Sequence, residues 1–239
     1  MGTPKISIII PTLNEAENIS RLLKHLDTSK TSKIPTEVII VDGGSTDTTI
    51  TIVQEYIQDH KSTNIVTINA QKGRAKQMNA GAAIAKGTIL YFLHADSFPP
   101  TGYAQNIVQE IEKGNAAGCF RMRFDRNHWW LRLASWLTQF PWRACRGGDQ
   151  SQFITKELFE ELGRYDERFI IYEDNDLINK LYARKEFVVI NNKITTSARR
   201  YQNNGIWKLQ YHFWAIYVKK WLGASAEELH EYYKKKIVS

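Results

Sequence analysis

The first half of the chain alternates apolar runs with amphipathic segments, and this alternation constrains the fold more than any other feature. Apolar, β-branched runs predict strands at residues 5–10, 37–41, 65–68 and 88–93. Apolar residues at helical spacing predict helices between them, at residues 14–26, 46–56 and 75–85. Strands that are apolar throughout are buried on both faces. The pattern therefore predicts an α/β fold, with a mostly parallel sheet covered by helices on both faces.

The second half differs in composition but shows no linker. All seven tryptophans follow residue 128. Residues 205–222 interleave aromatic residues with lysines, and a second predicted helix over residues 225–236 ends in three lysines. We therefore expect one domain over residues 1–204 and a C-terminal appendage of aromatic and basic helices over residues 205–239.

Charge and cysteine content narrow the functional classes. The formal net charge of +7 favours anionic partners. Zinc-finger spacing, an RNA-recognition signature and a helix-turn-helix are not evident, so no nucleic-acid partner is expected. Two cysteines without CxxC spacing indicate a reducing compartment. No apolar stretch approaches the roughly 18 residues of a membrane span. We expect a cytoplasmic protein, and the basic charge leaves open that it binds peripherally at the inner face of an anionic membrane.

Polar segments follow each of the four predicted strands, at residues 11–15, 42–47, 71–74 and 94–96. Each one alone could be an ordinary turn, and DGGSTD at 42–47 is a natural helix cap. Ligands of open parallel sheets, however, bind beyond the carboxyl ends of the strands, so together the segments predict a pocket. No GxGxxG or Walker A sequence is present. A nucleotide could still bind through Asp42, Lys72 and Arg74, with a metal at Asp96.

At this point a family resemblance is clear. IIIPTLNEAENI, VDGGSTDTT, KGRAKQMNAGAAIAKG and LYFLHADS, in this order, resemble the family 2 glycosyltransferases of the GT-A fold. The similarity covers roughly residues 5–200. It implies an inverting transfer of a sugar from a UDP- or GDP-linked donor to an acceptor hydroxyl, assisted by Mg²⁺ or Mn²⁺. The residues assigned to the nucleotide site are Pro11, Thr12, Glu15, Asp42, Ser45, Lys72, Arg74 and Ala95.

The segment His94-Ala95-Asp96 falls where the family has its Asp-x-Asp metal motif. The resemblance implies that Asp96 binds the metal, with His94 in place of the first aspartate. Oxygen ligands suit such a cation, which would neutralise the diphosphate leaving group. A buried histidine without metal is the alternative interpretation of His94.

A second group of residues lies further along the chain. Glu173 and Asp174 open an amphipathic helix, where acidic residues also simply complement the helix dipole. By resemblance they occupy the position of the catalytic base, and inverting transfer needs a carboxylate to accept the acceptor's proton. Asp174 is the expected base, supported by Glu173. The expected acceptor side comprises Gly148, Asp149 and Gln150, and the expected diphosphate contacts are Arg199 and Arg200.

Several alternatives stay open at this stage. The aromatic helices either pack on the domain or lie on an anionic membrane. The stretch from GRYDERF through TSARRY to the C-terminal aromatic helix most resembles a subgroup associated with arsenosugar biosynthesis. The acceptor is expected to be a small or lipid-linked molecule. The other functions considered are a sugar-1-phosphate nucleotidyltransferase and a basic module that binds membranes or nucleic acid without catalysis.

Overall fold

The computed structural model describes residues 5–29, 34–62 and 64–238, so the remaining residues of the two expected regions lie outside the description. One eight-stranded sheet has the order β3-β2-β1-β4-β7-β6-β8-β5. Its strands are β1 Ile6–Thr12, β2 Thr36–Asp42, β3 Ile65–Asn69, β4 Ile89–Phe92, β5 Ser97–Phe98, β6 Ala117–Phe124, β7 Gln152–Thr155 and β8 Val188–Thr196. The helices are α1 Ala16–Thr28, α2 Thr49–Asp59, α3 Arg74–Ile84, α4 Tyr103–Glu112, α5 Trp129–Leu137, α6 Lys156–Glu161, α7 Glu173–Ala183, α8 Arg199–Asn204, α9 Ile206–Trp221 and α10 Ala226–Tyr233.

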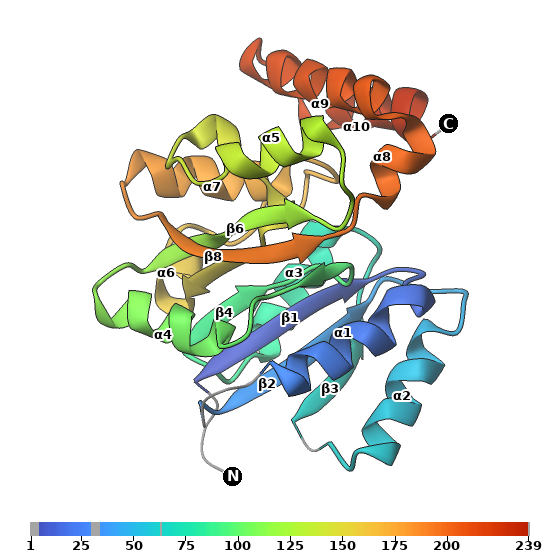
Figure 1. Cartoon of the computed structure of the whole chain (residues 1–239), viewed down its shortest axis with the longest axis vertical. Coiled ribbons are helices and arrows are strands. Elements are labelled where there is room, and N and C mark those ends of the chain that lie inside the picture. The colour runs from blue at the N-terminus through green and yellow to red at the C-terminus, as the bar shows by residue number, and fades with distance from the viewer. Residues whose placement is uncertain (1–4, 30–33, 63, 239) are drawn as a thin grey trace.

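The strands β3, β2, β1 and β4 pair in parallel, as the sequence predicts (Figure 1). Successive residues of β1 point to opposite faces and enter different cores. Ile8 and Ile10 pack with Leu22 of α1 and Val53 of α2. Ile9 packs in the other core, with residues of α3, α6 and α7. Helices therefore cover both faces, which explains why these strands are apolar throughout.

The rest of the sheet is mixed rather than parallel. β7 runs antiparallel to both of its neighbours, β4 and β6. β8 is parallel to β6 but antiparallel to the short β5, and the β6–β8 register shifts between Phe120 and Arg121. The expectation of a mostly parallel sheet thus holds for the four N-terminal strands. The antiparallel part brings the segment before β7 and the start of α7 next to the carboxyl end of β4.

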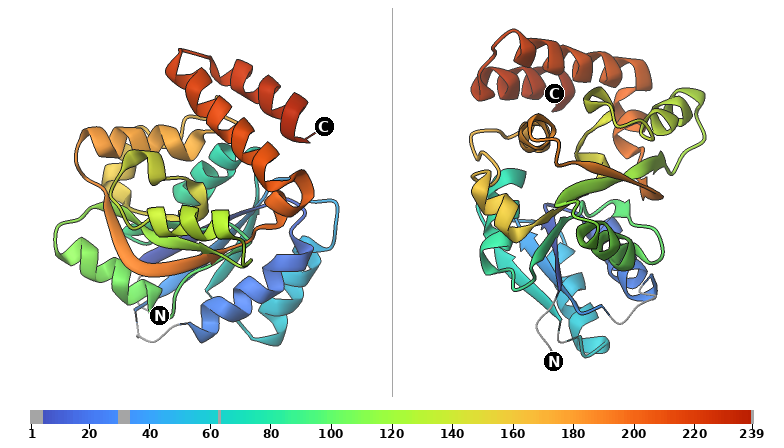
Figure 2. Two further views of the ribbon diagram at one scale, coloured as in Figure 1. Left: turned by 45° about the horizontal axis from the view of Figure 1, so that its top comes forward. Right: turned by 90° about the vertical axis from the view of Figure 1, so that its left-hand side faces the viewer.

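The helices α9 and α10 lie side by side at one end of the molecule (Figures 1 and 2). They pack on the segment before α7 through a small apolar cluster of Phe169, Ile171, Leu209, Ile216, Leu229 and Ile237. The buried residues of α9 are aliphatic, whereas three of its tryptophans are half or more exposed. None of the described helices is long and apolar enough to cross a membrane.

Candidate active site

The carboxyl ends of β1 and β2 form the first part of the site. The Asp42 carboxylate accepts hydrogen bonds from the backbone N–H groups of Gly44 and Ser45, at 2.9 and 2.8 Å. The Ser45 hydroxyl donates to it at 2.5 Å, and the Thr12 hydroxyl lies 3.4 Å away. Three residues assigned to the nucleotide therefore lie together, and Asp42 holds the turn that presents them. Pro11 is buried directly before Thr12.

A residue that the sequence did not single out fixes this edge. Gln77 of α3 is buried, and its side-chain amide donates to the carbonyl oxygens of Thr12 and Val41, both at 2.8 Å. A Cβ atom on Gly43 would lie 3.0 Å from the same amide. Gln77 thus locks the ends of β1 and β2 to α3. The only sequence signal is a polar residue beside the small apolar residues that α3 turns towards the sheet.

The segment after β4 turns sharply at the same edge. The Ser97 N–H donates to the His94 carbonyl at 3.1 Å, which closes a turn over residues 94–97. Ala95 is buried inside this turn, while His94 and Asp96 are partly exposed. Burial and the charge of Asp149 raise the pKa of Asp96, and Arg199 and Arg200 oppose that shift. The turn therefore leaves His94 and Asp96 partly exposed at the carboxyl edge of the sheet.

The start of α7 faces this turn. Asp174 Oδ2 lies 4.0 Å from His94 Nε2, and Asp149 Oδ1 lies 3.9 Å from His94 Nδ1. A Cβ atom on Gly148 would lie 2.0 Å from Asp174 Oδ2, so a side chain there would have to displace the carboxylate. Tyr172, the residue before α7, adopts a left-handed backbone with φ of 77°. Two segments from distant parts of the sequence, which carry Asp149 and Asp174, therefore converge on His94.

The environment tunes the protonation of these groups. Burial, reinforced by the charge of Glu173, raises the pKa of Asp174 to about 6, although His94 and Arg74 pull it down. Burial and the nearby Arg74 lower the pKa of His94. At neutral pH the site thus holds the neutral imidazole of His94 beside the ionised carboxylate of Asp174, whose pKa lies only slightly below that pH. Such a carboxylate is suited to accept a proton.

Glu173 has a different environment from its neighbour. Its side chain is fully buried, and Oε1 lies 2.7 Å from Arg74 Nε. Within the described residues neither carboxylate oxygen receives a well-directed hydrogen bond, so the contact is an ion pair. Burial raises the pKa of Glu173, and Arg74 opposes the shift. Burial alone would lower the pKa of Arg74, but Glu173, Asp174 and Asp149 raise it. Each charge depends on the other for compensation.

The remaining assigned residues are distributed unevenly. Arg199 lies 3.3 Å from Glu15 and 3.5 Å from Glu17, so it joins α8 to the start of α1. Arg200 contacts the Tyr233 hydroxyl and lies over its ring. Lys72 is exposed next to the turn before α3.

Gln150 points away from the cleft. Its side chain is buried, its Oε1 accepts from Arg146 at 2.6 Å, and its Nε2 donates to the Cys145 carbonyl at 2.5 Å. Arg146 also donates to the carbonyls of Thr138 and Phe140, at 2.7 and 2.6 Å. The structure therefore places Gln150 in a network that supports the acceptor-side loop, and leaves Gly148 and Asp149 at the cleft.

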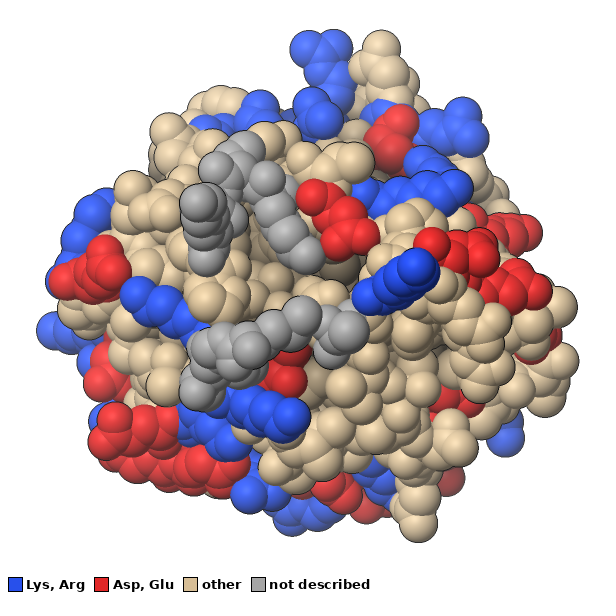
Figure 3. All heavy atoms as spheres, turned by 90° about the horizontal axis from the view of Figure 1, so that it is seen from below, with Lys and Arg blue, Asp and Glu red and all other residues tan. Residues whose placement is uncertain are grey.

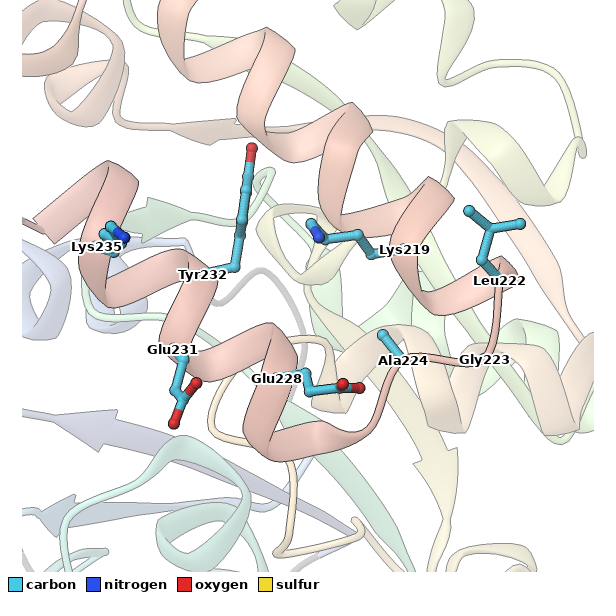
Figure 4. Close-up of a pocket in the computed structure, with 8 residues that line it drawn as sticks. All are labelled: Lys219, Leu222, Gly223, Ala224, Glu228, Glu231, Tyr232 and Lys235. Carbon is cyan, nitrogen blue, oxygen red and sulfur yellow. The ribbon is translucent and has the colours of Figure 1, made fainter.

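A hollowed surface of about 580 Å³ lies elsewhere, between α9 and α10 (Figure 4). Its lining includes Lys219, Leu222, Glu228 and Tyr232, and none of the assigned site residues. We place the site at the strand edge instead, because the titratable side chains converge there.

Fold and site together define an α/β enzyme class that binds its ligand at the carboxyl edge of the sheet and gathers carboxylates there. The glycosyl transferase family 2 model matches residues 7–165, and the chain belongs to this family. The mixed sheet with its flanking helices is the GT-A fold of glycosyltransferases.

Similar proteins agree with this assignment. The PGL/p-HBAD biosynthesis glycosyltransferase of Mycobacterium tuberculosis is 36% identical over 193 residues, which is 79% of this chain and 73% of the relative. A solved structure with a similar fold is the mannosyltransferase PcManGT from Pyrobaculum calidifontis in complex with GDP-Man and Mn²⁺. The match has a TM-score of 0.70 at 19% identity and covers 98% of this chain and 70% of PcManGT. The match to residues 1–349 of S. aureus TarS in complex with UDP has a TM-score of 0.65 at 19% identity. It covers 81% of this chain and 60% of the TarS chain.

Other curated relatives are much longer than the matched region. The matches span 36%, 47% and 34% of three of them. Their similarity therefore concerns a shared glycosyltransferase domain.

Proposed function

We propose that the chain is an inverting glycosyltransferase that moves a sugar from a UDP- or GDP-linked donor to an acceptor hydroxyl, with Asp174 as the general base. The observation that carries this proposal is the buried Asp174 carboxylate, which faces His94 at the carboxyl edge and has a pKa of about 6. Family membership supports sugar transfer. The solved neighbours in complex with UDP and GDP-Man support the donor class.

Asp174 acts on the acceptor. Its Oδ2 takes the proton of the acceptor hydroxyl while that oxygen attacks the sugar from the face opposite the leaving group. Gly148, which lacks a side chain, leaves room for the carboxylate at the acceptor-side loop. Glu173 stays in its ion pair with Arg74, which fixes the first turn of α7 and so orients Asp174.

A divalent cation, Mg²⁺ or Mn²⁺, fits these residues only in part. Among the described residues no three His, Cys, Asp or Glu side chains are grouped to hold a metal. Mg²⁺ commonly binds one or two carboxylates together with substrate phosphates. Asp96 would hold the ion, with His94 beside it and the donor diphosphate supplying further oxygens. When bound, the metal would neutralise the charge of the departing diphosphate.

A calorimetric titration tests the metal site. We expect Mn²⁺ to bind the wild type measurably only when the nucleoside diphosphate is present. Asp96→Ala should lose this binding and His94→Ala should lose less. His94→Asp should tighten binding without nucleotide, because it adds a second carboxylate. Tight Mn²⁺ binding by the nucleotide-free wild type would contradict this arrangement.

A thermal-shift screen tests the donor and the enzyme class. UDP, GDP, CDP and dTDP are added in turn with Mg²⁺ or Mn²⁺, and UDP or GDP should raise the melting temperature most. The same screen is run on Asp42→Asn, because the Asp42 carboxylate holds the turn after β2, where the nucleotide is proposed to bind. Stabilisation by a nucleoside triphosphate with sugar-1-phosphate, but by no diphosphate, would favour a nucleotidyltransferase. No shift with any nucleotide would favour the non-enzymatic module.

For the acceptor we propose a small or lipid-linked molecule on the cytoplasmic side. Similarity to the arsenosugar subgroup makes an arsenic-bearing alcohol one candidate. Mass spectrometry after incubation with labelled donor tests this, since the product gains one sugar. Transfer only to acceptors without arsenic would exclude the subgroup assignment.

A further inference from the structure

Helix α5 presents an aromatic stripe to the surface. Trp129, Arg132, Leu133 and Trp136 are spaced at i, i+3, i+4 and i+7, so they share one face of the helix. Trp129 and Trp136 are 60% and 52% exposed. The opposite side of the helix is held by buried Leu131. Both rings touch a neighbouring aromatic ring, that of Trp207 or Phe140, yet more than half of each tryptophan stays exposed.

Helix α9 presents a second stripe. Trp207, Tyr211, Trp214, Val218 and Trp221 follow at i, i+4, i+7, i+11 and i+14, which again is one face. The three tryptophans are 53%, 50% and 84% exposed. The fully or nearly buried residues of α9 are Leu209 and Ile216, so these three indole rings stay half or more in solvent.

The two stripes form one surface. The rings of Trp129 and Trp207 lie 5.6 Å apart, and those of Trp130 and Trp207 lie 5.1 Å apart. The Trp130 indole N–H donates to Gln210 of α9 at 3.2 Å. Figure 1 shows α9 lying next to α5. We call the joined stripes the aromatic surface. Soluble proteins rarely expose a contiguous apolar patch of this kind without a partner.

A basic groove of about 470 Å³ adjoins the aromatic surface, between α5 and the strands β6 and β8. Arg132 and Trp136 belong to both. The cations that line the groove are Arg121, Arg123, Arg126, Arg132 and Lys193. Its one acid, Asp125, already accepts a hydrogen bond from the Ala198 N–H at 2.9 Å.

The cations of the groove lack acidic partners. In the described part of the chain none of the five forms an ion pair with a carboxylate. Arg121 donates to Asn191, but its buried Nε has no hydrogen-bond partner among the described residues. Charges held this close without compensation favour an anionic ligand. The far end of the molecule, by contrast, mixes acidic and basic side chains (Figure 3).

We propose that the aromatic surface and the basic groove dock the protein on a bilayer that contains anionic phospholipids, with headgroup phosphates in the groove and tryptophan rings at the interface. Amphipathic aromatic rings and flanking cations are the composition of interfacial helices. A second copy of the chain fits less well. A two-fold interface on this surface would bring two groups of unpaired cations together. The proposal is independent of the transfer reaction, because it concerns residues outside the strand-edge site.

Co-sedimentation with vesicles tests the groove. The full chain should bind phosphatidylcholine vesicles that contain phosphatidylglycerol, bind pure phosphatidylcholine vesicles far less, and dissociate as salt rises. The triple variant Arg126→Gln, Arg132→Gln, Lys193→Gln should bind roughly a hundredfold more weakly, since each cation at an anionic surface contributes about fivefold. The control variant Lys24→Gln, Lys61→Gln, Lys86→Gln removes the same charge from exposed sites in the first half and should bind as the wild type does.

A second variant tests the aromatic surface. Trp129→Ser, Trp214→Ser and Trp221→Ser together should weaken binding at every salt concentration, by roughly tenfold for each ring that inserts about 50 Å² of apolar surface. Equal binding by the groove variant and its control would overturn the proposal. So would displacement by inorganic phosphate at constant ionic strength, or a wild-type dimer that the tryptophan variant converts to a monomer.

Discussion

At the scale of single residues, two adjacent carboxylates have been given different environments. Glu173 is fully buried against Arg74, at 2.7 Å, and Asp174 faces His94 at 4.0 Å. Burial and the charge of Glu173 raise the cost of ionising Asp174, whereas His94 and Arg74 reduce it. Only Asp174 faces His94. Glu173 therefore holds the start of α7 through its ion pair, and Asp174 is free to take a proton.

Replacing Asp174 by asparagine should reduce kcat by about 10²–10⁴ while nucleotide affinity stays near wild type. The matched control is Asp176→Asn in the same helical turn, where the carboxylate pairs with Lys180 at 3.1 Å. Steady-state kinetics and calorimetry measure both quantities. Normal turnover of Asp174→Asn would remove this residue from the mechanism.

The same substitution should not weaken the fold. The folded-state pKa of Asp174 is raised to about 6 from 3.8, so the folded protein holds this proton more tightly than the unfolded chain does. The stabilisation is present at low pH and is lost as pH rises from about 4 to about 6. At pH 7 the neutral asparagine avoids that penalty, so loss of rate cannot be assigned to unfolding.

The pH dependence of kcat/KM follows from the same pKa. The base must be ionised, so kcat/KM should fall as pH drops through about 6. Asp149→Asn should move the midpoint to lower pH, because the charge of Asp149 helps to raise the pKa of Asp174. A profile that stays flat across this region, or a midpoint that moves up in Asp149→Asn, would contradict the assignment.

At the scale of elements, the site depends on how closely the loop before β7 approaches α7. Gly148 and Asp174 come from different elements, and the carboxylate occupies the space where a side chain would stand. This approach is a packing constraint rather than a hydrogen bond. The acceptor-side loop is held from behind by the buried Arg146 and its carbonyl partners.

Gly148→Ala should therefore cost most of the transfer activity, because the new methyl group would lie 2.0 Å from Asp174 Oδ2 and must displace it. Gly147→Ala is the control: its backbone is extended, with φ of −170°, and a Cβ there meets nothing within 4 Å. Rates and circular dichroism of both variants are compared. Equal activity of the two would mean that the close approach has no catalytic role.

The elements differ in how far the sequence predicts them. β1 to β4 and the helices between them are confirmed within a few residues, because each carries one uniform apolar signal. Strands β6 and β8 were not predicted. β6 carries Arg121 and Arg123, and β8 carries Asn191, Asn192 and Lys193, which hide the strand pattern. Their polar faces border the basic groove, so local composition reflects that surface instead of the core.

The position of the candidate site residues in the fold was predictable for a similar reason, and only in part. Strand ends gather at one edge whenever strands are parallel, so Thr12, Asp42 and His94 could be placed together from sequence. Gln150 could not, because its direction depends on Arg146, whose buried hydrogen bonds arise only after the loop has folded. The contact between Trp129 and Trp207 likewise joins helices whose packing no local pattern specifies.

At the scale of the whole molecule, we propose that residues 205–239 form an appendage on the domain of residues 1–204. The small cluster around Leu229 and Phe169 joins the two and is separate from the cores that flank the sheet; surface contacts between α5 and α9 add to this junction. Stability of the appendage should therefore be separable from stability of the sheet.

Leu229→Ala tests this division. Leu229 is fully buried, so the truncation should cost about 2–5 kcal/mol. Leu222→Ala, at a leucine that is 74% exposed, should change stability by less than about 0.5 kcal/mol. Hydrogen exchange should rise in α9, α10 and the segment around Phe169, and stay slow in β1 to β4. Faster exchange throughout the sheet would show a single cooperative unit.

The ion pair between Arg74 and Glu173 has a consequence for kinetic order. Arg74 is the first residue of α3 and Glu173 the first of α7, so one contact joins the helix on the donor side to the helix that carries Asp174. A donor diphosphate that binds Arg74 must share this guanidinium with Glu173. Donor binding should therefore alter the contact that holds the start of α7. We therefore expect an ordered sequence in which the donor binds first and the acceptor second.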